Sequence, residues 1–179
     1  MNVEKYKAID YANDALEVLS QSEADTTMPE EAVFGIRIGS IGLLVSTSRF
    51  CEVLDKVQVN ALPNVHPWVS GILNLRGSLV PVFDLRVVLE EGAGDNKNRR
   101  LFAVDRDEKA VALWIESFPE IKDRASMQPL TELPALPEVL QRFVTGGYKQ
   151  GGQVWLDVKF EDLFKLLGSH QYTMEEIAT

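Results

Sequence analysis

The sequence predicts an all-β fold made of one small barrel or two paired barrels. The chain has 179 residues, which suits one ordinary domain or two small lobes that share a core. From residue 32 onward, turn residues separate about eight to ten short apolar or alternating segments of strand length. Strands and helices do not alternate along the chain, so a parallel sheet covered by helices is not expected.

The N-terminal residues are expected to lie apart from the strands. In residues 4–20 one apolar side chain recurs every three or four positions, which predicts an amphipathic helix. The segment 20–31 is polar and acidic and contains Pro29, which is typical of a linker. Two roles remain open for the helix: it packs back on the strand domain, or it docks on another protein.

The first half of the strand region contains two expected hairpins. Its expected strands are residues 32–39, 43–54, 57–62, 71–75 and 79–85. Gly39–Ser40 is placed at the first hairpin turn and Arg76–Ser78 at the tip of the second. The segment 62–71 contains two prolines, which favours an irregular crossing. Because Pro81 has no N–H to donate, we expect its strand at a sheet edge or at a bulge.

The second half contains further strands and two short helices. Its expected strands are residues 100–104, 110–115 and 153–158. The charged segment 105–109 is expected to be a turn, and residues 136–148 a short helix or crossing that leads into a strand. Residues 159–168 predict a helix that ends at Gly168. The chain therefore divides into an N-terminal helix and linker (1–31), a strand domain (32–168) and a polar tail (169–179).

Composition and charge restrict the classes of partner that we expect and predict the cellular compartment. The net charge is −9 and the basic residues are scattered, so nucleic acid is not an expected partner. An acidic surface also disfavours anionic membranes, and no apolar run approaches the roughly 20 residues that span a bilayer. A single cysteine and an N-terminus without an apolar signal region predict a cytoplasmic protein.

The sequence contains no pattern typical of a catalytic or metal site. There are only two histidines and one cysteine, so we expect neither a metal nor another cofactor. Cys51 lies between apolar residues and is expected to be a plain buried thiol rather than a nucleophile. No serine stands on a strand-to-helix elbow and no glycine-rich loop is followed by a lysine–serine pair. The function classes that remain are a small-molecule site and a protein-binding surface.

Arg76 stands at the tip of the most apolar segment of the chain, "GILNLRGSLVPVFDLR". Tight hairpin tips favour a glycine with positive φ, which accounts for Gly77 but not for the arginine. Two interpretations are open: Arg76 extends into water as an ordinary tip residue, or it is presented to a partner protein beside an apolar surface.

The segment Pro63–Arg86, with its NLRG, PV and DLR elements in order, resembles the signature of the CheW-like chemotaxis adaptors. Upstream, Glu52 and Val53 match a glutamate–aliphatic pair of that family. Downstream, the resemblance continues through "AVALWIESFPEI", "FVTGGY" and "VWLDVKFEDLFK". It covers Ala32 to Leu167.

The resemblance implies two small five-stranded SH3-like β-barrels that share a hydrophobic core, with short helices near the N- and C-termini. It implies a non-catalytic adaptor that couples the cytoplasmic tip of methyl-accepting chemoreceptors to the regulatory domain of a CheA-type histidine kinase. The residues that it assigns to partner binding are Phe50, Glu52, Gly71, Asn74, Arg76 and Gly77. It also implies that Glu52 orients Arg76, and we expect the pair to be exposed and to contribute little to stability.

Some positions differ from the family pattern. Phe50 is aromatic where the family often has an aliphatic residue, and Glu116 stands where an aspartate is common. The long N-terminal arm and the Pro67–Trp68 pair resemble the PilI-like adaptors of pilus-based (twitching) motility. The alternative function is a small-molecule-binding or enzymatic small β-barrel domain.

Overall fold

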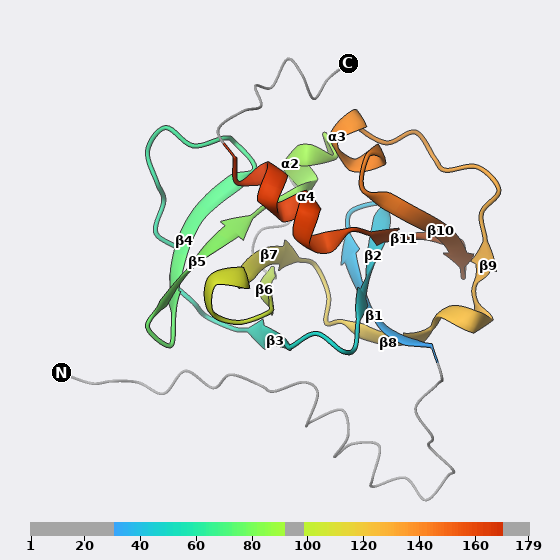
Figure 1. Ribbon diagram of the computed structural model, residues 1–179, viewed down its shortest axis with the longest axis horizontal. Coiled ribbons are helices and arrows are strands. Elements are labelled where there is room, and N and C mark those ends of the chain that lie inside the picture. Colours follow the sequence, from blue (N-terminus) through green and yellow to red (C-terminus); the bar gives the residue numbers. More distant parts are fainter. Residues whose placement is uncertain (1–30, 92–98, 170–179) are drawn as a thin grey trace, which may run out of the picture.

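The computed structural model describes residues 31–91 and 99–169. It contains two curled sheets that lie side by side, with helix α4 (Phe160–Leu167) placed over the junction between them (Figure 1). The all-β prediction of two small barrels is therefore confirmed. The predicted N-terminal helix, the predicted linker except Glu31, and the polar tail except Ser169 lie outside the described residues.

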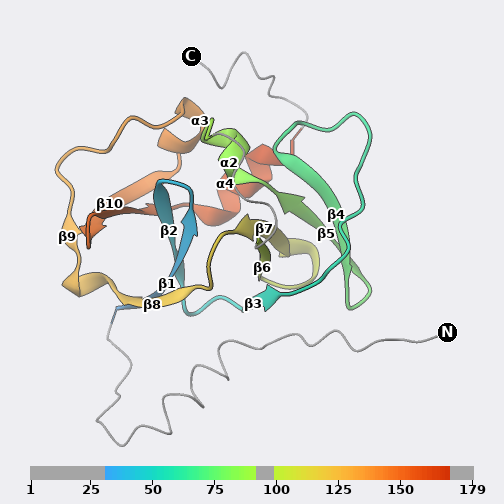
Figure 2. The same cartoon turned by 180° about the vertical axis from the view of Figure 1, so that it is seen from behind.

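The first barrel is a six-stranded sheet, one short strand more than expected. In order across the sheet its strands are β8 (Glu120–Asp123), β1 (Ala32–Ile38), β2 (Ile41–Ser46), β11 (Gln153–Val158), β10 (Val144–Gln150) and β9 (Gln128–Pro129). All neighbours are antiparallel except β2 and β11. The two edge strands are linked by the short helix η3 (Arg124–Ser126), and Figure 2 shows the chain curving around this side of the barrel.

The second barrel is a five-stranded sheet. In order across the sheet its strands are β3 (Cys51–Leu54), β6 (Arg100–Val104), β7 (Val111–Ile115), β5 (Ser78–Phe83) and β4 (Val69–Leu75). Asn60, beyond the end of β3, exchanges two main-chain hydrogen bonds of 2.7 and 2.9 Å with Ile72 of β4. This bridge joins the two edges of the sheet and closes the barrel.

One large hydrophobic core is shared by both barrels, as the resemblance implied. It combines apolar side chains from β1 and β2 with side chains from β3, β6 and β7 and from helix α4. The helix contributes Phe160, Leu163, Phe164 and Leu167, which recur at helical spacing and are all buried. Trp68, which is 1% exposed, donates from Nε1 to the Leu167 carbonyl at 2.8 Å and so fixes the end of α4.

The remaining helices are short and lie near the turns. They are α2 (Leu85–Val88), η2 (Asp107–Lys109) and α3 (Glu138–Gln141). The helices expected within residues 136–148 and 159–168 are present, and Gly168 caps α4. In the described part of the chain, every helix is too short or too polar to span a bilayer.

Some strand predictions were wrong in detail. Residues 43–54 form parts of two strands rather than one, because a turn after Ser46 sends β2 and β3 into different sheets. Residues 57–62 contribute only the Asn60 bridge. Strands β8 and β9 were not predicted, because β8 has three charged residues among its four and β9 has only two residues.

The expectation that Pro81 lies at a sheet edge or at a bulge is also wrong. Strand β5 runs between β4 and β7, and the register shift in the β4–β5 pair lies at Val69–Gly71, not opposite Pro81. Its position explains why the missing N–H does no harm. Pro81 faces Ile72, whose own N–H and C=O are bonded to Asn60 on the other side of β4. The ladder to β7 begins only at Val82.

Candidate partner-binding site

The tip of the β4–β5 hairpin is a two-residue turn in which both central residues have positive φ. The φ angles are 53° at Arg76 and 91° at Gly77. This is the geometry of a type I′ turn, whose twist matches that of the flanking strands. Asn74 accepts a hydrogen bond from the Gly77 amide at 2.9 Å and stabilises the turn. Asn74 and Gly77 therefore place Arg76, and both are exposed.

Arg76 reaches from the hairpin tip to Glu52 on β3. Its Nη2 lies 2.7 Å from Glu52 Oε2, so the expected ion pair is present. The Arg76 side chain is 55% exposed, whereas that of Glu52 is 0% exposed. The expectation of an exposed pair is thus wrong for the acid, because β3 places Glu52 opposite Ala103 of β6, inside the barrel wall.

Burial makes Glu52 dependent on Arg76. The second carboxylate oxygen, Oε1, is buried and has no hydrogen-bond partner among the described residues. Removing one member of a buried ion pair leaves an uncompensated charge, which costs about 3–5 kcal/mol when both members are buried. Arg76 therefore has a structural role, and its exposed half remains available to a partner.

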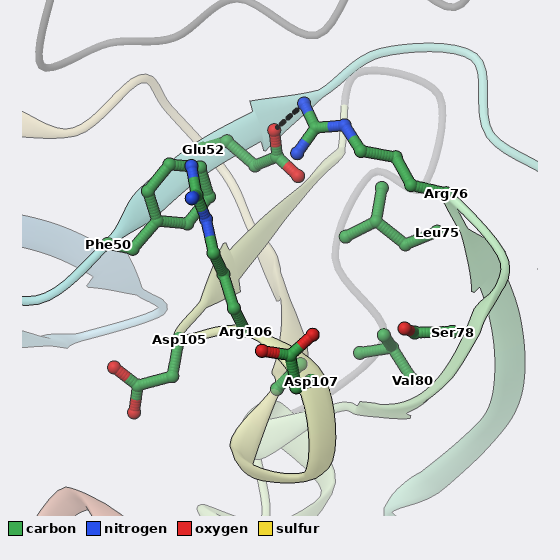
Figure 3. A pocket seen from close by; sticks show the side chains of 10 residues that line it. Phe50, Glu52, Leu75, Arg76, Ser78, Val80, Asp105, Arg106 and Asp107 are labelled. Atoms are coloured by element: carbon green, nitrogen blue, oxygen red, sulfur yellow. Dashed lines mark hydrogen bonds and ion pairs between the residues drawn. The ribbon is translucent and has the colours of Figure 1, made fainter.

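A pocket of about 330 Å³ lies beside this pair (Figure 3). It lies between the hairpin tip and the turn that joins β6 to β7. The residues that line it are Phe50, Glu52, Leu75, Arg76, Ser78, Val80, Asp105, Arg106, Asp107 and Ala110. Three of the six residues assigned to partner binding therefore meet here: Phe50, Glu52 and Arg76.

Phe50 forms one wall of the pocket together with Arg106. The Arg106 guanidinium lies 3.5 Å from the centre of the Phe50 ring. The Phe50 carbonyl accepts a hydrogen bond from the Asp105 amide at 2.8 Å, which fixes the β6–β7 turn against it. Sequence reasoning missed Arg106 as a pocket residue, because residues 105–109 were expected to form a turn rich in charge.

Gly71 lies away from the pocket and is buried. Its φ of +136° is strained for other residues, and a Cβ there would overlap the carbonyl oxygen of Asn60. The absence of a side chain allows the main chain beyond β3 to approach β4 and close the barrel. In this structure Gly71 supports the site from inside and offers no surface to a partner.

Cys51 precedes Glu52 on β3 and is a plain buried thiol, as expected. It is 3% exposed. Burial raises the pKa of the thiol to about 12; the nearby Asp105 carboxylate raises it further, while Arg49 lowers it. A thiol with this pKa is protonated at neutral pH and is not a nucleophile. Within residues 31–91 and 99–169, no group of three His, Cys, Asp or Glu side chains could hold a metal ion.

Glu116 does not line this pocket and lies between the two barrels. It pairs with Arg86 and accepts a hydrogen bond from the Gly39 amide at 3.1 Å. Glu91 accepts one from the Ser40 amide at 2.7 Å. The unusual glutamate therefore holds the β1–β2 turn of one barrel against the other barrel and does not line the pocket.

The comparison with protein families decides the identity of the domain. The family model described as "CheW-like domain" matches residues 32–167, which run from β1 to the end of α4. The chain belongs to the CheW-like family. This match confirms the resemblance that the sequence motifs of the CheW-like chain indicated.

Its curated relatives include PilI, CheW and FrzA proteins. Protein PilI of Pseudomonas aeruginosa is 29% identical over 123 residues, which cover 68% of each chain. The chemotaxis protein CheW of Klebsiella aerogenes is 21% identical over 160 residues, covering 89% of this chain and 93% of the relative. Protein FrzA of Myxococcus xanthus is 33% identical over 64 residues, or 36% of this chain and 40% of the relative.

The fold has a counterpart among solved structures. The scaffolding protein TtCheW of Thermoanaerobacter tengcongensis superposes with a TM-score of 0.64 and 23% sequence identity. The match covers 80% of this CheW-like chain and 98% of the other. The two proteins therefore share the arrangement of two barrels.

Proposed function

We propose that this protein is a non-catalytic signalling adaptor that couples methyl-accepting chemoreceptors to a CheA-type histidine kinase. The observation that carries the proposal is the family match, which spans the whole two-barrel domain. The similarity to CheW over most of both chains supports the same function. We expect the adaptor to lie in the cytoplasm and to reach the membrane only through its partners.

The pocket beside Arg76 is proposed as a partner contact. An arginine that is half exposed and oriented by a buried carboxylate is already positioned before a partner arrives, so little side-chain entropy is lost on binding. Arginines of this kind are frequent anchors of protein interfaces. Leu75 and Val80, which also line the pocket, supply apolar surface next to the cation.

We propose that no reaction takes place in this pocket. Its nearest thiol, Cys51, is buried and protonated at neutral pH. The alternative of a ligand-binding or enzymatic barrel predicts that a small molecule stabilises the isolated protein. A thermal-shift screen that finds such a molecule, with no affinity for a kinase regulatory domain, would favour that alternative.

The pathway is proposed to be one of pilus-based motility. The chain is 29% identical to PilI and 21% identical to CheW over the matched residues. The higher identity to PilI supports this branch. The PilI-like features of the sequence are the long N-terminal arm and the Pro67–Trp68 pair. Trp68 is now seen to anchor α4, so this residue supports the fold and does not by itself select a receptor.

Direct binding measurements test the adaptor function. The full chain is titrated with the regulatory domain of a CheA-type kinase and with a chemoreceptor cytoplasmic tip, both from the source organism. We expect it to bind each protein and to hold both in one ternary complex on size-exclusion chromatography. Absence of binding to both proteins would contradict the proposal.

A further inference from the structure

Arg106 is held at the pocket by a turn with unusual backbone geometry. Asp105 and Asp107, on either side of it, have φ of 64° and 56°, whereas Arg106 is extended with φ −131° and ψ 164°. Residues in the left-handed region cost energy and are often found where a side chain must be aimed. An ion pair between Asp105 and Arg49 fixes the turn from behind.

The Arg106 side chain is exposed and is positioned by stacking rather than by an acid. Its guanidinium lies over the Phe50 ring, and it makes no ion pair within the part of the chain that the structure describes. Stacking of this kind restricts the guanidinium but leaves the N–H groups at its edge free to donate. Figure 3 shows Arg106 running alongside Phe50 on one side of the pocket, and Arg76 reaching across from the hairpin tip on the other.

The carboxylates of the pocket do not satisfy these two cations. Glu52 is fully buried and bonds only one nitrogen of Arg76, and Asp105 is engaged by Arg49. Each guanidinium carries five N–H donors, so donors of Arg76 and Arg106 remain for a ligand. The exposed Asp107 is the one lining carboxylate without an ion pair among the described residues.

We propose that Arg106 is a second partner-binding residue and that the pocket between Arg76 and Arg106 binds an acidic side chain of the partner protein. The proposal rests on the proposed adaptor function and names the chemistry of its contact. A carboxylate accepts two parallel hydrogen bonds from a guanidinium fork, and such charge-assisted bonds are the stronger ones. The like charge of Asp107 opposes the ligand and makes binding weaker than two arginines alone would give.

The test measures binding of the full chain to the same kinase regulatory domain and receptor tip. Arg106→Gln should lower the affinity for one of the two proteins about tenfold, because its hydrogen bonds to the acid are lost. Arg106→Lys should recover only part of the loss, since lysine lacks the planar fork. Arg142→Gln is the matched control: it removes the same charge from an exposed position directly after α3, on the other barrel, and should leave both affinities unchanged.

Two further variants test the role of the Phe50 ring and the charge of the group that the pocket binds. Phe50→Leu removes the stacking ring and should weaken binding, and combining it with Arg106→Gln should add little, because both act on one contact. Asp107→Asn should strengthen binding about threefold, since it removes the like charge. A weakening by Asp107→Asn would show that the pocket takes a hydrogen-bond donor and would overturn the acidic assignment.

The outcomes distinguish this inference from the proposed function. If the unmodified chain binds both proteins and Arg106→Gln binds them equally well, the inference fails and the adaptor function stands. If the unmodified chain binds neither protein, the adaptor function itself fails. Circular dichroism and the melting temperature verify that each variant is folded, which we expect because Arg106 is exposed.

Discussion

Glu52 and Arg76 form an ion pair of 2.7 Å in which the acid is completely buried and the base is half exposed. Glu52 lies on the edge strand β3, whereas Arg76 lies in the turn that joins β5 to β4 at the opposite edge of the five-stranded sheet. The pair therefore connects the barrel interior to its surface. Arg76 compensates a buried charge and at the same time presents a guanidinium to the solvent.

Arg76→Ala should destabilise the protein by about 2–3 kcal/mol. The loss is smaller than the roughly 3–5 kcal/mol for a fully buried pair, because water can reach the vacated half-exposed position. Urea denaturation of the full chain measures the free energy of unfolding. A variant as stable as the unmodified protein would show that Glu52 does not depend on Arg76.

A double replacement provides the control for this loss. Glu52→Met combined with Arg76→Met removes both charges and keeps similar side-chain volumes. Replacing a buried ion pair by apolar residues of similar size is often neutral or stabilising. We expect the double variant to be more stable than Arg76→Ala. If it is less stable, the cost comes from packing rather than from the unpaired carboxylate.

Gly71→Ala and Gly77→Ala should differ in cost although both residues have positive φ. At Gly71 a Cβ meets the main chain of Asn60, whereas at Gly77 it meets nothing within 4 Å. We expect a loss of about 1 kcal/mol at Gly77 from backbone strain alone and a clearly larger loss at Gly71. Thermal unfolding of the two variants measures these losses. Equal losses would mean that the main chain at Asn60 moves to accommodate the Cβ at Gly71 without a loss of stability.

The stability of the protein should fall at high pH because of Cys51. Its pKa is raised from 9.0 to about 12 in the folded state, so folding favours the protonated thiol. The stabilisation is complete below pH 9 and is lost as the pH rises from 9 toward 12. Urea unfolding from pH 8 to 11 should show a steeper loss for the unmodified protein than for Cys51→Ala. Parallel curves would contradict the raised pKa.

Local sequence signals were sufficient for the β4–β5 hairpin. The apolar strands and the Arg-Gly tip identify a tight turn, and the structure shows the type I′ geometry that such a tip favours. The helix at residues 159–168, with Gly168 past its end, was likewise predicted, and the structure shows that it buries one face. In both cases the decisive residues are neighbours in the sequence.

Contacts between residues that are distant in the sequence could not be predicted from local patterns. Residues 43–54 are mostly apolar on both sides of the polar centre 46–49, so no local signal says that β2 and β3 belong to different sheets. The pairing of Glu52 with Arg76 came from the family resemblance, and the burial of Glu52 depends on β6, which follows much later in the chain. Arg106 was missed because its stacking partner, Phe50, is distant in sequence.

The role of Arg76 in the adaptor contact is tested most directly by the affinity of the double variant Glu52→Met, Arg76→Met. This variant loses the arginine without leaving an unpaired buried carboxylate. The unmodified chain and the variant are titrated calorimetrically with the kinase regulatory domain and with the receptor tip. Truncating a central interface arginine can cost about 2 kcal/mol, so we expect affinity for at least one protein to fall about thirtyfold. A folded double variant that binds both proteins as tightly as the unmodified chain would contradict the assignment of Arg76 to the partner contact.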